Sequence, residues 1–430
     1  MPLRLNTAQS DFEAQFAALL GGKREASVEV GDVVAGIIRD VRTSGDAAVV
    51  ELTNRFDKAG VTAQTLRFTP EEIDAAAARV SADVVAALQT AHDRIRSHHE
   101  KQLPQDHVYT DALGVTLGSR WTAVDAVGIY VPGGLASYPS SVLMNAVPAR
   151  VAGVERIAMV VPTPNGQLSP SILAAARIAG VSEIYRVGGA QAVAALAYGT
   201  ATIARVDKVV GPGNAYVAAA KRQVFGQVGI DMIAGPSEVL VIADGSANPA
   251  WIAADLIAQA EHGGGAQSIL VTTEPDLADA VASEVDRQLS LLPKEGLARE
   301  GWDEFGAIIV VRSLGEAVEL ANRIASEHVE LAVDDPQALV PRIHHAGALF
   351  LGHHTPEAIG DYVGGSNHVL PTARSARFAS GLGVLDFMKR TSILGCTPGS
   401  LAALAEPAIT IANVEALEGH GRSIAIRLNR

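Results

Sequence analysis

Cysteine is nearly absent from this 430-residue sequence, which contains only Cys396. A single thiol cannot form an intramolecular disulfide, and it cannot supply a thiolate cage for a metal ion. No base or cationic residue lies close to Cys396 in the sequence, so nothing there would activate the thiol as a nucleophile. We therefore expect Cys396 to be a small buried residue.

Positive charge is in deficit, since 34 Lys and Arg residues stand against 47 Asp and Glu residues, for a formal net charge of −13. A field of this sign repels phosphate backbones, and no basic run with interleaved aromatic residues offsets it. Uncharged apolar runs of about 18 residues are also missing, so we expect no membrane-spanning helix. Residues 1–16 carry Asp11 and Glu13 and lack an apolar core, unlike a secretory signal. The sequence therefore predicts a cytoplasmic protein with no nucleic-acid or membrane partner.

Aromatic residues make up only 4% of the chain, whereas 48% of the residues are hydrophobic. Small and aliphatic side chains let helices pack closely on sheets, and a chain of this length suits two or more domains. Residues 1–100 show apolar positions at helical spacing. We expect helices there over 32–43, 46–56, 70–80 and 83–99, with Thr69 as the N-cap before Pro70.

From Val124 onward, short β-rich runs alternate with alanine-rich helical segments, which is typical of parallel, doubly wound sheets. The expected strands are 124–131, 156–161, 183–187, 208–210, 239–243, 268–273, 307–311, 329–333 and 348–351. After about Ser380 the pattern becomes helical again. The prediction is an α/β fold with two doubly wound, incomplete Rossmann-like domains, a helical N-terminal region and a C-terminal tail. We place one domain at 1–125 plus 238–380, the second at 126–237, and the tail at 381–430.

Three glycine-rich loops follow predicted strands of the 126–237 domain. They are Tyr130-Val131-Pro132-Gly133-Gly134, Val187-Gly188-Gly189-Ala190-Gln191 and Gly211-Pro212-Gly213-Asn214. Doubly wound folds bind nucleotides at such loops, but the complete G-x-G-x-x-G fingerprint is absent, because Tyr216 stands where the third glycine belongs. Any one loop could be no more than a tight strand-to-helix turn. Together the three loops predict a shared ligand site, although they do not identify the ligand.

Four places concentrate polar side chains within apolar sequence. They are Gln259-Ala260-Glu261-His262, Glu327-His328, the segment 360–368 with Asp361 and His368, and Glu415 with His420. Gln259 and His262 lie three residues apart at the end of a predicted helix, so they share a face and could bind a metal ion together. Glu327 and His328 could supply two proton-transfer groups at a helix-to-strand junction. Taken singly, each could equally be a helix cap or a hydrogen-bonded surface group.

Taken in order, these segments resemble the histidinol dehydrogenase family over essentially the whole chain. The resemblance rests on residues 128–134 (GIYVPGG), 209–214 (VVGPGN), 233–238 (IAGPSE), 255–262 (DLIAQAEH), 327–331 (EHVEL), 360–370 and 415–420. It implies a zinc-dependent, NAD-linked enzyme that oxidises L-histidinol through L-histidinal to L-histidine, with two NAD⁺ and one water. These are the last steps of histidine biosynthesis.

The resemblance also implies a role for individual residues. One zinc ion per subunit would be bound by Gln259, His262, Asp361 and His420. The substrate would contact these ligands together with Ser237, His328, His368 and Glu415. Tyr130, Gln191 and Asn214 would line the NAD site in the 126–237 domain, while the other domain would hold metal and substrate. Because the family's tail crosses to the neighbouring subunit, the resemblance implies a homodimer with shared active sites, in which the 381–430 tail is exchanged.

The same resemblance makes Glu327 and His328 the acid–base pair. We expect His328 to be the general base in both oxidations, because imidazole titrates near neutral pH. Glu327 is expected to activate the water that attacks the aldehyde, while zinc anchors the imidazole and amine of the substrate. A thiohemiacetal route would need a well-placed cysteine, and Cys396 does not suit that role.

Three other functions fit parts of the sequence. A dehydrogenase on the same scaffold could oxidise another small polyol or a sulfonated diol, although His368 and Glu415 suit a cationic, imidazole-bearing substrate. A zinc hydrolase with Glu327 as its base would leave the three glycine loops unexplained. A non-catalytic binding protein of two lobes would not explain the Glu327-His328 pair.

Overall fold

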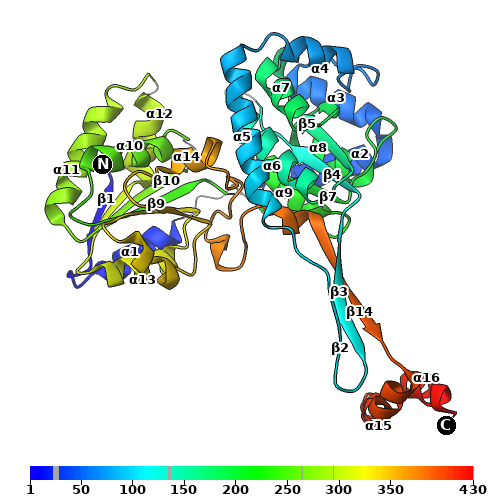
Figure 1. The fold of residues 1–430 in the computed structure, drawn as a ribbon. Coiled ribbons are helices and arrows are strands. Elements are labelled where there is room, and N and C mark those ends of the chain that lie inside the picture. Colours follow the sequence, from blue (N-terminus) through cyan, green and yellow to red (C-terminus); the bar gives the residue numbers. More distant parts are fainter. Residues whose placement is uncertain (23–28, 134–136, 234, 263–264, 294, 430) are drawn as a thin grey trace.

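The computed structural model of the chain describes residues 1–22, 29–133, 137–233, 235–262, 265–293 and 295–429. Gly134, Ala234, Gly263 and Gly264, which belong to sequence motifs or their flanks, lie outside the described residues. Two lobes and a projecting arm make up the molecule (Figure 1). None of the described helices is long and apolar enough to cross a membrane.

The first lobe is built on a parallel sheet of six strands, in the order β1-β11-β10-β9-β12-β13. The strands are β1 (Leu3–Asn6), β9 (Glu238–Ala243), β10 (Gln267–Thr272), β11 (Ala307–Val310), β12 (His328–Ala332) and β13 (Ala348–Leu351). One face packs on α1 (Phe12–Gly21) and α13 (Leu314–Ile324). The other packs on α10 (Pro249–Ala260), α11 (Pro275–Leu289) and α12 (Glu295–Phe305). Helices cover both faces, so the four central strands β9 to β12 are almost wholly buried, whereas the edge strands β1 and β13 are only partly buried.

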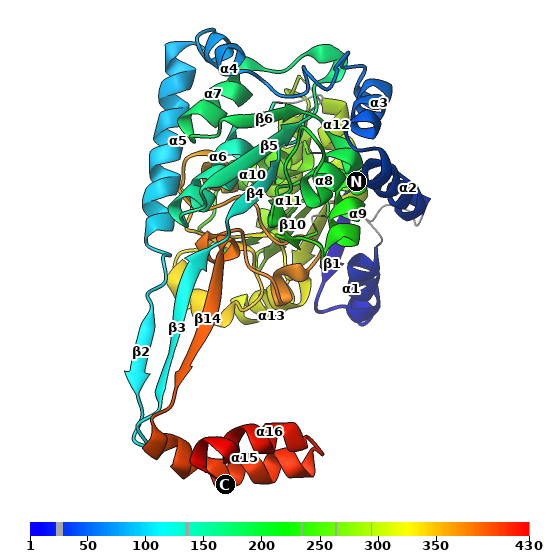
Figure 2. The ribbon, with the colours of Figure 1, turned by 90° about the vertical axis from the view of Figure 1, so that its right-hand side faces the viewer.

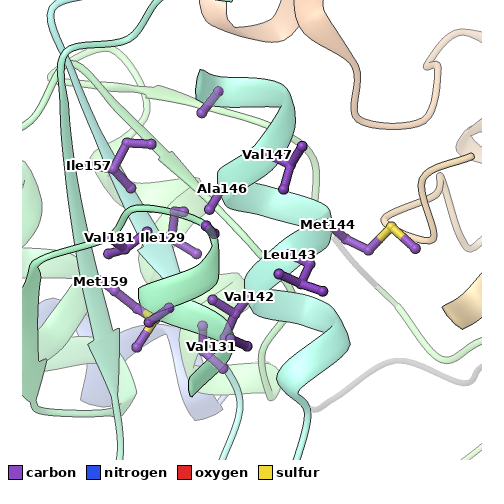
Figure 3. Packing of buried hydrophobic residues seen from close by; sticks show 14 of the residues in the cluster. Ile129, Val131, Val142, Leu143, Met144, Ala146, Val147, Ile157, Met159 and Val181 are labelled. Atoms are coloured by element: carbon purple, nitrogen blue, oxygen red, sulfur yellow. The ribbon is translucent and has the colours of Figure 1, made fainter. Parts of the chain in front are cut away.

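The second lobe is built on a parallel sheet of five strands, in the order β6-β5-β4-β7-β8. These are β4 (Ala126–Tyr130), β5 (Arg156–Val161), β6 (Glu183–Arg186), β7 (Lys208–Val210) and β8 (Gly229–Ile230). One face is covered by α4 (Pro70–Ala77), α5 (Ala82–Glu100), α6 (Pro139–Val151) and α7 (Pro170–Ile178). Figure 3 shows Val142 and Ala146 of α6 on the side of the helix that faces Ile129, Ile157 and Met159 of this sheet, whereas Met144 points away from it. The opposite face is covered by α2 (Glu29–Ser44), α3 (Asp46–Asp57), α8 (Gly189–Tyr198) and α9 (Ala215–Val224).

An antiparallel sheet of three strands forms the arm, in the order β14-β3-β2. It comprises β2 (His107–Thr110), β3 (Thr116–Ala123) and β14 (Met388–Gly395), and it leads to α15 (Pro398–Val414) and α16 (Glu418–Ala425). Figures 1 and 2 both show the arm extending away from the lobes, with α15 and α16 at its far end. A short helix, α14 (Glu357–Tyr362), follows β13.

The α/β class with two parallel sheets is confirmed, and the predicted strands after Val124 lie within one or two residues of the observed ones. Thr69 caps α4 through a capping box with Glu72, because its hydroxyl accepts the Glu72 N–H at 3.2 Å. The antiparallel sheet, β1 and the short strand β8 were not expected. Cys396 is exposed rather than buried, so that prediction was wrong. The residue follows β14 at the far end of the arm, between that strand and α15, where no packed core covers it.

The predicted domain division groups residues 1–125 with residues 238–380. Of the first group, β1 and α1 pack with the six-stranded sheet. Helices α2 to α5 instead share apolar cores with the five-stranded sheet. The N-terminal helices therefore contribute to both lobes.

Candidate active site

A cavity of about 820 Å³ lies between the two lobes. The five-stranded lobe lines it with Tyr130, which ends β4, and with the loop after β7. The six-stranded lobe lines it with residues at the starts of β9 and β12 and at the ends of α10 and α14. Predicted site residues that line this cavity are Tyr130, Asn214, Ser237, Gln259, His262, Glu327, His328, Asp361 and His368.

His328 is the first residue of β12, and its ring is held in one tautomer. Nδ1–H donates to the Glu238 carbonyl oxygen at 2.9 Å, so Nε2 carries the free lone pair. Nε2 is buried without a hydrogen-bond partner in this structure. Burial lowers the pKa of His328 to about 4, so the imidazole is neutral at pH 7. A neutral imidazole with an unpaired nitrogen on the cavity can accept a proton from a bound hydroxyl group.

Glu327 directly precedes His328 and is just as deeply buried. Its Oε2 accepts the Glu238 N–H at 3.0 Å, and the Ser237 hydroxyl also donates to the carboxyl group. Burial raises the pKa of Glu327 well above its usual range, and the charges of Glu238 and Asp361 raise it further. The carboxyl group therefore favours the protonated form unless a cation lies beside it.

Three of the four predicted metal ligands reach the cavity from one chain. Both amide atoms of Gln259 are buried and have no hydrogen-bond partner. His262 Nδ1–H donates to the Ala258 carbonyl oxygen at 3.1 Å, which leaves Nε2 free as a ligand atom. Asp361 lines the same cavity. Within the described part of the chain, no three His, Cys, Asp or Glu side chains are close enough to hold a metal ion, so a complete site would need further ligands.

The fourth predicted ligand, His420, lies in α16, and Glu415 lies at the C-terminal end of α15. Both side chains are exposed at the far end of the arm, away from the cavity of their own chain (Figure 2). This structure of one chain therefore does not bring Glu415 and His420 together with the other predicted site residues.

His368 lies between the two lobes. Its Nδ1–H donates to the Asp361 carbonyl oxygen at 3.0 Å, and its Nε2 lies 3.4 Å from the Ser141 hydroxyl of α6. Burial lowers the pKa of His368, so the ring is neutral. The ring thus links the loop that carries Asp361 to the lobe of the five-stranded sheet.

The predicted cofactor residues follow three strands of the five-stranded sheet. Tyr130 accepts the Gly189 N–H on its hydroxyl at 3.0 Å, which ties two of the glycine loops together. Asn214 caps α9, because its Oδ1 accepts the N–H groups of Tyr216 and Val217 at 3.1 and 3.2 Å. These two N–H groups at the start of α9 therefore already have a hydrogen-bond partner within the protein. Gln191 is buried in α8 and does not line the cavity.

Comparison with known proteins identifies the family. The family model described as histidinol dehydrogenase matches residues 22–428. The chain is 64% identical to histidinol dehydrogenase of Agrobacterium fabrum and 63% identical to that of Nitrobacter winogradskyi. Each alignment covers 100% of this chain and at least 99% of the relative. This chain belongs to the histidinol dehydrogenase family.

The fold agrees with a solved member of the histidinol dehydrogenase family. The crystal structure of histidinol dehydrogenase from Elizabethkingia anophelis superposes with a TM-score of 0.95 at 34% identity. The superposition covers 100% of this chain and 98% of that one. As a member of this family, the chain is an NAD-linked oxidoreductase.

Several buried charged groups near the histidinol dehydrogenase cavity were not singled out in the sequence. Glu357 Oε2 is buried, has no hydrogen-bond partner and lies 3.7 Å from His328 Nδ1. Lys221 and Asp231 form a buried ion pair that also lines the cavity. Glu357 precedes Asp361 by four residues, and this helical spacing was the available signal. The sequence contains no comparable signal for the Lys221–Asp231 pair, since the two residues lie ten positions apart, one in α9 and the other directly after β8.

Proposed function

We propose that this chain oxidises L-histidinol through L-histidinal to L-histidine, using two NAD⁺ and one water, in the cavity between its lobes. The observation that carries the proposal is the neutral, unpaired His328 Nε2 in the same cavity as Tyr130 and Asn214. A proton acceptor and a dinucleotide-type loop facing one space suit removal of a proton and a hydride from one carbinol group. The names of the relatives support L-histidinol as the substrate.

The donor set fits zinc. The partnerless, buried amide of Gln259, the free Nε2 of His262 and the carboxylate of Asp361 supply oxygen and nitrogen ligands without thiolate. We propose that these three residues hold one zinc ion, and that His420 of a second copy completes the set. When bound, zinc would anchor the imidazole and amine of the substrate, and NAD⁺ would accept the hydride.

In the first oxidation His328 removes the hydroxyl proton. Its Nδ1–H bond to the Glu238 carbonyl orients the ring and leaves Nε2 without a partner, and burial keeps that nitrogen unprotonated. Ser237 and Glu238 fix the Glu327 carboxyl beside it. The pair is thus rigid before the substrate arrives, which limits reorganisation during the reaction.

In the second oxidation Glu327 removes a proton from the water that adds to the aldehyde carbon. The carboxyl group must be ionised for this task, and a cation among Gln259, His262 and Asp361 would offset the burial that now raises its pKa. His328, which has released its first proton to solvent, then takes the proton from the hydrate hydroxyl. Across both oxidations the carbinol carbon loses two hydrides, which NAD⁺ would accept, and one water is added, so the alcohol becomes the acid.

We propose a homodimer in which the arm carries Glu415 and His420 into the site of the neighbouring copy. The exposed position of both side chains, remote from their own cavity, supports this exchange. Apolar side chains exposed near them, such as Ile411, Val414 and Leu417, are suited to burial against a partner. We also propose that the enzyme acts in the cytoplasm, because a biosynthetic NAD-linked oxidation uses the cytoplasmic pool of the coenzyme.

Product identification tests this function. Zinc-loaded protein is incubated with L-histidinol and NAD⁺, and the carbon products are followed by NMR. The proposal expects L-histidine as the final product, with no aldehyde accumulating. No conversion of L-histidinol, together with turnover of another small polyol or diol, would favour the related dehydrogenase instead.

A further inference from the structure

Gly211 is held from both sides by a buried ion pair. Lys221 Nζ donates to the Gly211 carbonyl oxygen at 3.0 Å, and Asp231 Oδ2 accepts the Gly211 N–H at 2.8 Å. The ammonium and carboxylate groups also contact each other directly. Lys221 comes from α9, and Asp231 directly follows β8, so the pair joins two elements that flank the loop.

Both side chains are almost completely removed from solvent, at 2% exposure for Lys221 and 1% for Asp231. Burial of two full charges is unfavourable, and an apolar pair of similar size would often be no less stable. Stability of the lobe alone therefore does not explain the pair. A buried ionic pair does, however, fix the geometry of the groups that it contacts.

The groups that it fixes belong to the predicted cofactor loop. Gly211 has φ of +108°, and a Cβ atom there would lie 2.2 Å from the Tyr130 carbonyl oxygen. The loop therefore packs directly against the end of β4. Tyr130, Gly211, Asn214 and both members of the pair line one cavity. The ion pair is thus placed to set where the Gly211–Asn214 loop lies relative to Tyr130.

We propose that Lys221 and Asp231 are positioning residues for the dinucleotide, acting through the Gly211–Asn214 loop. The inference rests on the proposed function, because it takes this loop to contact NAD⁺. Their hydrogen bonds go to Gly211 and their ion pair joins them to each other, with no such contact to Gln259, His262 or Asp361. Loss of the pair should therefore weaken NAD⁺ binding without weakening L-histidinol binding.

The double variant Lys221→Met/Asp231→Asn tests this role without leaving a lone buried charge. NAD⁺ binding to the zinc-loaded enzyme is measured by calorimetry without L-histidinol, and steady-state kinetics give KM and kcat. We expect the Kd and KM for NAD⁺ to rise by about tenfold or more. The KM for L-histidinol and kcat at saturating NAD⁺ should stay within about twofold of the wild-type values.

Arg156→Met is the matched control, because Arg156 and Glu183 form an ion pair in the same sheet and Arg156 also holds backbone carbonyls. Neither residue lines the cavity. This control should lower the melting temperature while leaving the Kd for NAD⁺ unchanged. If the double variant behaves in the same way, the pair is structural only and the proposal is wrong.

Lys221→Arg keeps the inference testable if the double variant does not fold. This variant retains the charge but cannot place a single ammonium between Gly211 and Asp231. A raised Kd for NAD⁺ would support the positioning role, and a wild-type Kd would overturn it. Failure of the wild-type enzyme to bind NAD⁺ at all would overturn the proposed function as well, which separates the two outcomes.

Discussion

At the scale of the residue, His328 and Glu327 show how one backbone segment prepares two side chains for different tasks. Both side chains form hydrogen bonds with the backbone of Glu238. His328 Nδ1–H donates to the Glu238 carbonyl oxygen, and the Glu327 carboxyl group accepts the Glu238 N–H. Burial acts on them in opposite directions, since it lowers the pKa of the imidazole and raises the pKa of the carboxyl group. Both effects favour the neutral forms, so His328 is prepared as a base in this structure and Glu327 is not.

Replacement of these two residues should separate the two oxidations. His328→Asn should slow oxidation of L-histidinol and of L-histidinal by about 10²- to 10⁴-fold, because each needs the same proton acceptor. Glu327→Gln should slow mainly the oxidation of L-histidinal, where water must be activated. Single-turnover rates with each substrate would measure both effects.

His99→Asn serves as a control, since His99 is fully buried but is absent from the cavity lining. It should leave both rates close to those of the wild type. Small and equal losses in the His328 and Glu327 variants would contradict the assigned roles.

Acidic side chains close to Glu357, among them Asp255 and Glu330, make stability depend on pH. Burial raises the pKa of Asp255 from its ordinary value of 3.8 to about 6, so the folded chain binds this proton more tightly than the unfolded chain does. The free energy of unfolding should therefore fall as the pH rises from about 4 to 7. Asp255→Asn should reduce that fall by about 1 kcal/mol or more.

Urea unfolding of the metal-free protein at several pH values would measure this slope. Asp276→Asn, at an exposed position in the first turn of α11, is the control and should leave the slope unchanged. A variant of Asp255 with the wild-type slope would show that its carboxyl group does not carry the effect.

The sequence was sufficient to predict the identities of most candidate site residues, but not their burial or hydrogen-bond partners. The pairing of Glu327 with His328 and the spacing of Gln259 and His262 were visible as motifs. The orphaned amide of Gln259 depends on which atoms surround it in three dimensions, and no spacing shows that.

At the scale of the element, strands with strong apolar character were predictable and exposed strands were not. Strands β5, β7 and β13 match their predicted bounds because they are short apolar runs between turn residues. Strand β2 is exposed along its whole length, so it lacks the alternating or continuous apolar pattern that marks a strand. Strand β14 was missed for a similar reason, since most of its residues are exposed.

The loop after β7 gives a prediction at this scale. Gly211→Ala should raise the KM for NAD⁺ by at least about tenfold, because the added methyl group meets the Tyr130 carbonyl and alanine disfavours the positive φ. Gly226→Ala is a close control, since Gly226 has φ of +99° and no atom lies within 4 Å of the added carbon.

Steady-state kinetics with varied NAD⁺ would measure the KM for NAD⁺ in both variants. Gly226→Ala should share the strain of a positive φ but not the effect on KM. An equal effect in both variants would assign the loss to backbone strain alone, and not to displacement of the loop.

At the scale of the whole molecule, the projecting arm separates Glu415 and His420 from the other candidate site residues of the same chain. The lobes supply the acid–base pair, three candidate metal ligands and the cofactor loops, whereas Glu415 and His420 lie at the end of the arm. Exchange of the arm between two copies would unite all of them. The sequence alone indicated a tail but not its three-stranded support.

Mixed dimers test the exchange. His420→Ala and His328→Asn variants, each nearly inactive alone, are unfolded and refolded together in equal amounts. If sites are shared, one site of each mixed dimer is intact, and random pairing should restore about a quarter of wild-type activity. Activity no greater than the sum of the two variants would place His420 in the site of its own chain.

The most direct test of the proposed reaction is the number of NADH molecules formed per molecule of limiting L-histidinol, with zinc-loaded protein and excess NAD⁺. Two NADH per L-histidinol are expected, and a chelator should abolish the reaction. One NADH per substrate would contradict the proposed reaction, because the enzyme would then stop at the aldehyde and Glu327 would have no water to activate.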